Sequence, residues 1–321
     1  MSGNAIEVKG LSRKFGAFTA VDNVSFDVKQ GEIFGFLGAN GAGKSTTIRM
    51  LCALLQPTSG TALVGGYDIR TEPEKVKLSI GYMSQRFSLY DDLTVEQNIR
   101  FYGGVYGLST SRVTERMAWV LSMANLKGRE GSLTRTLPGG IKQRLALGCA
   151  ILHEPRILFL DEPTGGVDQI SRRNFWELIN RLSADGITVL VTTHFLDEAE
   201  FCNDIILMNA GKLIAAGSPT ELKTEHITDP ILEVRVREDR IVDALESVRT
   251  RPWAIETSVF GTALHVMVKS EREGKKLITD GLAEIGLEAL QIERIIPSLE
   301  DVFLYLLDRE AARPAAEVKG I

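Results

Sequence analysis

One segment, Gly38-Ala-Asn-Gly-Ala-Gly-Lys-Ser45, constrains the fold of this chain more than any other feature. It has the form G-x-x-x-x-G-K-[ST], follows an apolar run of strand length and leads into a helical pattern. Glycines let the backbone turn so that successive N–H groups point at phosphate oxygens, and the helix N-terminus adds a favourable dipole. We therefore predict a strand, a phosphate-binding loop and a helix, with Lys44 reaching the β- and γ-phosphates of a nucleotide and Ser45 ligating Mg²⁺.

The surrounding sequence predicts an α/β domain. Residues 1 to about 220 alternate short apolar runs with longer amphipathic patterns, which is typical of a largely parallel core sheet. The clearest strands are predicted at Glu32–Leu37, Ser79–Met83, Arg156–Leu160 and Ile187–Thr192. Two helical faces with apolar residues at i, i+3, i+4 and i+7 are predicted to pack on this core: Ile48, Leu51, Cys52 and Leu55 in the first, and Phe175, Leu178, Ile179 and Leu182 in the second.

The pattern changes at about residue 222. Alternating strands, one of them with Leu232, Val234 and Val236 on one face, and two short helices follow in the order β-α-β-β-α-β, which fits a ferredoxin-like unit. The predicted segments are a helix through Ile241, Ala244, Leu245 and Val248, a hairpin over 254–268 turning at Phe260–Gly261 with Leu264, Val266 and Val268 on one face, a helix through Ile278, Leu282 and Ile285, and a strand over 287–295. Ser298 and Asp301 are expected to cap a last helix through Leu307, before an irregular tail over 309–321.

Composition and charge exclude several classes of protein. The net charge of −5 gives no general attraction to nucleic acid, and none is expected as a partner. Cys52, Cys149 and Cys202 are too few and too widely spaced for a disulfide framework or a zinc site, and we expect reduced, buried thiols. No targeting segment is visible, and no apolar run approaches the roughly 18 residues that span a bilayer. If the protein acts at a membrane, we expect another chain to span it.

A second motif supplies carboxylates. The apolar strand Arg156-Ile-Leu-Phe-Leu ends in Asp161-Glu162, which places both acids at the carboxyl edge of the sheet, where α/β proteins bind ligands. Asp161 suits a Mg²⁺ partner, and Glu162 is placed to polarise an attacking water.

The segment Leu137-Pro-Gly-Gly-Ile-Lys-Gln-Arg144, just before these carboxylates, resembles the signature motif of ATP-binding cassette (ABC) ATPases. No N-K-x-D guanine-reading motif occurs, which weakens a GTPase alternative. The resemblance covers residues 5 to about 220 and implies a P-loop cassette, with a mixed, mainly parallel sheet and a helical subdomain at about 86–155, in a domain over 1–221. An accessory ferredoxin-like domain over 222–308 follows.

The resemblance also implies roles for further residues. Phe15 would stack on adenine, Gln85 would contact Mg²⁺ and couple to a membrane partner, Asp168 would belong to the D-loop, and His194 would contact the γ-phosphate. Together with the phosphate loop, the expected ATP-binding residues are Phe15, Gly38, Asn40, Gly41, Ala42, Gly43, Lys44, Ser45, Thr46 and Gln85. The expected catalytic residues are Lys44, Glu162 and His194, and the expected Mg²⁺ ligands are Ser45, Gln85 and Asp161.

Two positions depart from the family pattern. Pro138 replaces the signature serine, whose hydroxyl donates in the family to the γ-phosphate bound by the opposite subunit, and Gly165 replaces a D-loop serine. Losing a hydrogen bond to a charged group costs on the order of 1.5–3 kcal/mol. The N–H groups of Gly139 and Gly140 can still meet phosphate at a helix start. Because Lys44, Asp161, Glu162 and His194 are all present, we expect an active ATPase with a modified composite site, and a degenerate half of an asymmetric pair is the competing interpretation.

The resemblance implies a dimer and a membrane partner. A phosphate loop faces the signature of a second cassette, from an identical or homologous chain, with ATP and Mg²⁺ between them. A separate permease is expected to dock after Gln85, where Phe87, Leu89, Tyr90 and Leu93 provide apolar side chains. The ending PSLEDVFLYLL resembles drug- and antibiotic-exporting ATPases, which implies an exporter subunit at the cytoplasmic face of the membrane. The alternative is a soluble ABC ATPase of the cluster-assembly or repair type.

Overall fold

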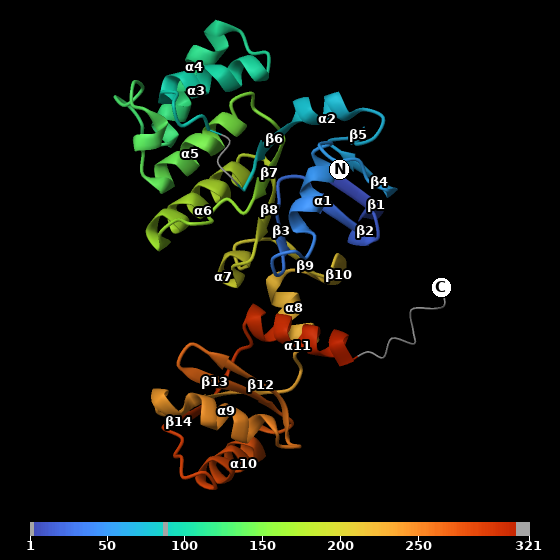
Figure 1. Ribbon diagram of the computed structural model, residues 1–321, viewed down its shortest axis with the longest axis vertical. Coiled ribbons are helices and arrows are strands. Elements are labelled where there is room, and N and C mark those ends of the chain that lie inside the picture. The colour runs from blue at the N-terminus through green and yellow to red at the C-terminus, as the bar shows by residue number, and fades with distance from the viewer. Residues whose placement is uncertain (1–2, 86–88, 313–321) are drawn as a thin grey trace. The chain divides into compact units, whose positions relative to one another are not determined.

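The computed structural model describes residues 3–85 and 89–312, and the chain divides into two compact units, Met1–Ser218 and Pro219–Ile321. In Figure 1 the first unit runs from blue to yellow and the second from orange to red. Helix α8 (Pro219–His226) begins the second unit, so the boundary predicted at residue 221 falls inside this helix.

The first unit is built on a six-stranded sheet within the described residues, which confirms the predicted mixed, mainly parallel core. Strands β9, β3, β8, β7 and β6 are parallel neighbours, and β10 closes one edge in the antiparallel direction. Their bounds, in sheet order, are β10 (Lys212–Gly217), β9 (Asp204–Asn209), β3 (Ile33–Leu37), β8 (Thr188–Thr193), β7 (Ile157–Asp161) and β6 (Ile80–Met83). Every residue of β3, β7 and β8 is buried, as expected where helices cover both faces of a parallel sheet.

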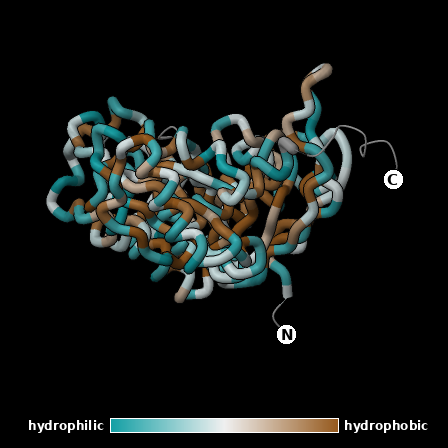
Figure 2. Tube along the Cα trace, turned by 90° about the horizontal axis from the view of Figure 1, so that it is seen from below, coloured by the Kyte–Doolittle hydropathy of each residue, from teal (hydrophilic) through white to brown (hydrophobic). Residues whose placement is uncertain are grey.

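A second, antiparallel sheet contributes the other wall of the same core. Its strands, in sheet order, are β2 (Phe18–Lys29), β1 (Asn4–Phe15), β4 (Ser59–Val64) and β5 (Tyr67–Asp68). Helices α1 (Lys44–Leu51), α2 (Pro73–Ser79), α6 (Gln169–Ala184) and α7 (Leu196–Ala199) complete this part of the unit. In Figure 2 hydrophobic segments run through the interior, and hydrophilic turns lie at the outside. The predicted apolar face of α1 is one turn too long. Helix α1 ends at Leu51, and Ala53 adopts a positive φ of 53°, which is not helical. Leu55 therefore packs on the core from outside the helix.

Three helices form a separate cluster, which Figure 1 shows side by side in teal and green. They are α3 (Val95–Val105), α4 (Thr110–Met123) and α5 (Gly139–Ala150), with a short 3₁₀ turn at Thr134–Thr136. Their buried side chains, among them Ile99, Val120, Leu126 and Leu145, make a hydrophobic core distinct from that of the sheets. This cluster lies within the range predicted for the helical subdomain.

All three cysteine thiols are buried and free, as predicted. Burial raises the pKa of each thiol well above its ordinary value, because a thiolate is poorly stabilised away from water.

The second unit has the predicted β-α-β-β-α-β order. Its elements are β11 (Ile231–Arg235), α9 (Ile241–Arg249), β12 (Ala254–Phe260), β13 (Ala263–Val268), α10 (Glu271–Ala283), β14 (Gln291–Ile295) and the last helix α11 (Leu299–Ala312), with a 3₁₀ turn at Glu238–Arg240 before α9. The sheet order β12-β13-β11-β14, with every pairing antiparallel, is the ferredoxin-like arrangement. The predicted hairpin turns at Phe260–Gly261, where the register pairs Phe260 with Ala263.

Four predicted bounds in this unit are wrong. Strand β11 ends at Arg235, one residue before Val236, which the prediction placed on it. Helix α10 ends at Ala283, so Ile285 lies beyond it, and β14 begins at Gln291 rather than at 287. Helix α11 continues to Ala312, past the predicted end at Leu307 and into the predicted tail. The polar last turn of α11 hid its length, because periodicity is visible only where apolar residues repeat.

Helix α11 also buries the second face of the small sheet. Leu264 and Val266 face the core shared with α9 and α10, as predicted, but every residue of β13 is buried. His265, on the face of β13 away from this core, is covered by α11 and is 5% exposed. Its Nδ1 lies 2.8 Å from Oδ1 of Asp301, at the start of α11. Asp301 also accepts from the N–H and hydroxyl of Ser298 while the Ser298 hydroxyl accepts from the Asp301 N–H, which is the predicted reciprocal cap.

We expect Asp301→Ala to destabilise the full chain by about 2–4 kcal/mol, because it removes the cap and leaves buried polar groups of His265 and Ser298 without their acceptor. Burial by itself raises the pKa of the Asp301 carboxyl, but hydrogen bonds from His265 and Ser298 outweigh it and leave that pKa below its ordinary value. This stabilisation is therefore complete above the unfolded-state pKa and is lost as the pH falls through the lower folded-state pKa. Denaturant unfolding between pH 7 and pH 3 measures both effects. Asp243→Ala, which breaks an exposed ion pair with Arg240, is the matched control. An equal loss of unfolding free energy in both variants would contradict the stabilising role assigned to Asp301.

Candidate functional site

The predicted phosphate loop connects β3 to α1, as the motif requires. Gly43, just before the helix, has φ of 104°, and a Cβ atom there would lie 2.6 Å from the carbonyl oxygen of Ala20, so only glycine fits. Lys44 is the first residue of α1 and is 4% exposed; its Nζ donates to the carbonyl oxygens of Gly38 (2.7 Å) and Ala39 (3.1 Å). Burial lowers the pKa of Lys44, an effect that nearby carboxylates partly oppose.

Asp161 ends β7 and is 1% exposed. Its Oδ1 accepts from the hydroxyls of Ser45 and Thr192, each at 2.8 Å. Its Oδ2 is buried and has no hydrogen-bond partner among the described residues. A buried carboxylate oxygen without a donor, beside a serine hydroxyl, fits the oxygen ligands that Mg²⁺ requires.

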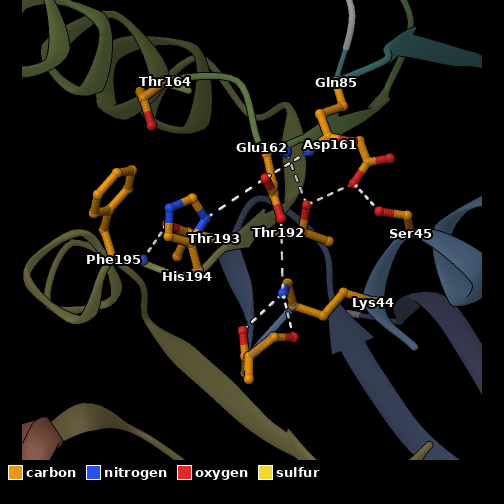
Figure 3. A network of polar contacts seen from close by, with 12 residues as sticks. Lys44, Ser45, Gln85, Asp161, Glu162, Thr164, Thr192, Thr193, His194 and Phe195 are labelled. Atoms are coloured by element: carbon orange, nitrogen blue, oxygen red, sulfur yellow. Dashed lines mark hydrogen bonds and ion pairs between the residues drawn. The ribbon is translucent and has the colours of Figure 1, made fainter. Parts of the chain in front are cut away.

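Glu162 lies at the centre of the site (Figure 3). Its carboxylate accepts from Gln85 Nε2 at 2.8 Å, lies 3.7 Å from Lys44 Nζ and lies 3.5 Å from His194 Nδ1. Its φ is +48°, a left-handed conformation that costs an L-residue on the order of 1–2 kcal/mol. Its N–H donates to the Thr192 hydroxyl at 2.8 Å, which helps to hold this strained backbone in place.

Lys44, Ser45, Gln85 and Glu162 border a cavity of about 380 Å³, whereas Gly38, Asp161 and His194 are not part of its lining. The lining residues are Phe15, Phe18, Ala20, Asn40, Gly41, Ala42, Gly43, Lys44, Ser45, Thr46, Gln85 and Glu162. Phe15 is 47% exposed and lines the cavity beside the phosphate loop, and the Arg13 guanidinium lies 4.5 Å from the centroid of its ring. Sequence reasoning missed Phe18, which is 64% exposed across the β1–β2 turn from Phe15; the short spacing Phe-Gly-Ala-Phe was the available signal.

Four predicted residues lie elsewhere on the same unit. Pro138 is the N-cap residue of α5, Gly139 and Gly140 begin that helix, and none of them lines the cavity formed by the described residues. Gly140 packs against the first turn of α6, where a Cβ atom would lie 2.4 Å from Ser171 Oγ. Asp168 caps α6 by accepting from the Ser171 N–H at 3.0 Å, and hydrogen bonds from Ser171 hold the pKa of Asp168 below its ordinary value.

His194 follows β8, and its ring lies at a tilt of 37° to the neighbouring Phe195 ring, with centroids 4.1 Å apart. Sequence reasoning also missed Thr192, which contacts both acids of the site. Buried threonines in a hydrophobic strand carry no periodic signal, and only the pairing of β7 with β8 brings Thr192 opposite Asp161.

A larger cleft, of about 780 Å³, lies in the same unit, at the start of β7 and β8, and Arg116, Trp119 and Glu154 are among its lining residues. None of the predicted site residues borders it. The chemistry predicted from the motifs therefore gathers at the smaller cavity.

Comparison with known proteins agrees with this geometry. The ABC transporter family matches residues 21–165. The probable multidrug ABC transporter ATP-binding protein YbhF of Escherichia coli is 55% identical over 224 residues, which are 70% of this chain and 39% of that protein, so the chain spans well under half of that relative. The linearmycin resistance ATP-binding protein LnrL of Bacillus subtilis is 36% identical over 95% of this chain and 98% of its own length.

Among solved structures, the dimeric ATP-binding cassette MJ0796, in a post-hydrolysis state with ADP and phosphate, is similar with a TM-score of 0.61. Sequence identity is 27%, and the match covers 66% of this chain and 98% of that one. The sheets, the helical cluster and the phosphate loop of the first unit are therefore those of an ATP-binding cassette, and the chain belongs to the ABC transporter family.

Proposed function

We propose that the chain is the ATP-binding and ATP-hydrolysing subunit of an ABC exporter. The observation that carries this proposal is the convergence of Lys44, Gln85 and His194 on the Glu162 carboxylate, at the edge of a cavity lined by the phosphate loop. ATP is the substrate, with its adenine beside Phe15 and its triphosphate against the loop N–H groups.

Hydrolysis needs a positioned water, charge stabilisation and a proton acceptor. Glu162 accepts a proton as the water attacks the γ-phosphorus, and the bond from that phosphorus to its bridging oxygen breaks to leave ADP and phosphate. Lys44 stabilises charge on the β- and γ-phosphates, and His194 holds the γ-phosphate. Ser45, Asp161 and Gln85 would hold Mg²⁺, which supplies positive charge to the phosphate oxygens; the unpartnered Asp161 Oδ2 supports this assignment.

The proposed active form is a dimer of cassettes. The signature residues Pro138, Gly139 and Gly140 lie outside the cavity of their own chain, which suits a role at the ATP held by the partner cassette. Pro138 offers no hydroxyl, so this contact relies on N–H groups at the start of α5, where the helix dipole favours phosphate. Gly165 in the D-loop likewise lacks the hydroxyl of the serine that the family has at this position.

The proposed membrane partner is a separate permease that docks on the helical cluster. No helix of the described residues is long and apolar enough to cross a bilayer. Of the four residues predicted to dock, Phe87 lies outside the described residues and Leu89 packs on the helical core. Leu93 is half-buried, and Tyr90 is exposed. The Tyr90 ring meets Phe101 edge-on at 4.7 Å, and Val105 follows one turn later and is 60% exposed, which gives an apolar patch that sequence reasoning located only in part.

The names of the relatives favour export over the soluble cluster-assembly or repair alternative. YbhF is described as a probable multidrug transporter protein and LnrL as a linearmycin resistance protein, and LnrL extends over the second unit as well. We accordingly propose that Pro219 onward is an accessory ferredoxin-like domain and that the chain acts at the cytoplasmic face of the membrane.

Affinity purification of tagged Glu162→Gln chain from native membranes, with ATP and Mg²⁺, tests the proposal. We expect a polytopic membrane protein to co-purify, and Phe101→Glu to abolish its recovery because a charge in the apolar patch opposes docking. Leu78→Glu, at an exposed apolar position on α2, is the control and should retain the partner. Recovery of soluble partners alone would favour the repair or cluster-assembly alternative.

A further inference from the structure

Glu198, on the short helix α7, is a buried carboxylate to which the motifs assign no role. It is 1% exposed, although a carboxylate is costly to bury unless donors surround it. Its Oε1 accepts from the Thr164 hydroxyl at 2.5 Å, and its Oε2 accepts from the Thr193 hydroxyl at 2.7 Å. The Arg172 guanidinium lies 3.4 Å away and neutralises its charge.

The first of these contacts fixes the loop that carries the proposed general base. Glu162, Pro163 and Thr164 follow β7, and each is held from a different element. The Glu162 N–H donates to a hydroxyl of β8, Gln143 on α5 donates to the Pro163 carbonyl, and Thr164 donates to Glu198 on α7. These three hydrogen bonds, from three different elements, explain how the strained backbone of Glu162 is maintained.

The second contact fixes the segment that carries the switch histidine. Thr193, which donates to Glu198, directly precedes His194, and its hydroxyl also accepts from the Phe195 N–H at 2.9 Å. The Arg172 guanidinium, paired with Glu198, lies 3.8 Å from the centre of the Phe195 ring. Figure 3 shows His194 turned toward Glu162, with Thr193 next to His194 in the same segment and Thr164 on the loop that carries Glu162. The Glu198 carboxylate therefore connects the segment of Glu162 to the segment of His194. The side chains of these two residues lie 3.5 Å apart.

We propose that Glu198 is a positioning residue that sets the geometry between Glu162 and His194, and thereby the rate of ATP hydrolysis. This inference rests on the proposed function of the site. Glu198 is not among the residues that line the cavity, so we expect its effect on the chemical step rather than on nucleotide binding. A displacement of about 1 Å at a reacting group can lower a rate by about 100-fold.

Glu198→Gln tests the proposal, because it keeps the side-chain volume but cannot accept from both threonines or neutralise Arg172. In the full chain we expect kcat for ATP to fall by about tenfold or more, while the Kd for a fluorescent ATP analogue changes by less than about threefold. A kcat within about twofold of that of the unaltered chain, or a loss of kcat matched by an equal loss of folded protein in circular dichroism, would overturn it.

Two threonine variants separate positioning from general stability. Thr164→Val and Thr193→Val each remove one donor to Glu198, and each should lower kcat with little further loss when combined with Glu198→Gln, since contacts that act together are not additive. Thr188→Val is the matched control: Thr188 is buried on the same strand, β8, and its hydroxyl accepts from the Gly31 N–H at 2.9 Å, at the far end from His194. If Thr188→Val lowers kcat as much, the specific role is wrong.

Hydrogen exchange supplies a readout that does not depend on turnover. In Glu198→Gln the amides of Gly165 and Val167, which donate to carbonyls of this loop, should exchange faster, while the amides of α1 stay protected. Unchanged exchange in the loop would overturn the positioning role. Glu162→Gln distinguishes this failure from that of the proposed function: hydrolysis that survives Glu162→Gln refutes the catalytic assignment itself, whereas a Glu162-dependent activity that Glu198→Gln leaves intact refutes only the inference about Glu198.

Discussion

Glu162→Gln should reduce ATP hydrolysis by about 100-fold or more and leave ATP bound between two cassettes. The amide keeps the shape of the carboxylate and can still accept from Gln85 Nε2, but it no longer takes a proton from water, and removing a general base typically costs about 10²–10⁴ in rate. ATP that is not cleaved continues to bridge the phosphate loop of one chain and the signature of the other. Phosphate release measures the first effect, and light scattering of the eluted protein in ATP and Mg²⁺ measures the second.

Glu177→Gln is a suitable control for this variant, because Glu177 lies half-exposed on α6 and makes only a surface pair with Arg173. It should hydrolyse ATP at the rate of the unaltered chain. A monomeric elution of Glu162→Gln in ATP and Mg²⁺ would count against the dimeric mechanism, and unchanged hydrolysis would remove Glu162 from the catalytic assignment.

Lys44→Ala should weaken ATP binding by about 10- to 100-fold. The ammonium group is the one positive charge contributed by the lining of the cavity that the described residues form, and a hydrogen bond to a charged phosphate is worth on the order of 1.5–3 kcal/mol. The loop is expected to loosen as well, because Lys44 Nζ now ties together the carbonyls of Gly38 and Ala39. Equilibrium titration with a fluorescent ATP analogue measures the change in Kd.

Lys44→Met distinguishes the charge from the packing, since it keeps the buried apolar stem while removing the ammonium. We expect Lys44→Met to bind ATP as weakly as Lys44→Ala but to unfold at a higher denaturant concentration. Lys75→Ala, which removes an exposed lysine paired with Glu72, should bind normally. Normal binding by Lys44→Met would mean that the ammonium is not a phosphate ligand.

Local patterns were sufficient for much of this architecture. The strand–loop–helix around Lys44 and the strand ending in Asp161 could be predicted because each is specified by neighbouring residues, and parallel strands bring their carboxyl ends to one edge. The β-α-β-β-α-β order of the second unit was visible for the same reason.

What could not be predicted depends on contacts between distant residues. The left-handed backbone of Glu162 follows from hydrogen bonds made by β8, α5 and α7, and no single segment encodes it. Glu198 resembles any acid in an amphipathic turn until folding buries it beside Thr164. Likewise, the sequence of β13 has the alternating pattern of a half-exposed strand. Its second face is buried because α11 packs on it, where His265 pairs with Asp301.

The enclosure of all three thiols makes the native chain a convenient background for site-specific labelling. Cys52, Cys149 and Cys202 are at most 6% exposed, and burial keeps them protonated at neutral pH, so alkylating reagents should react slowly with them. A single cysteine introduced at an exposed position, such as Thr136 near the signature or Ile170 at the start of α6, would then carry a fluorophore or spin label without prior removal of native cysteines. Distances between such probes would follow the opening and closing of paired cassettes during turnover.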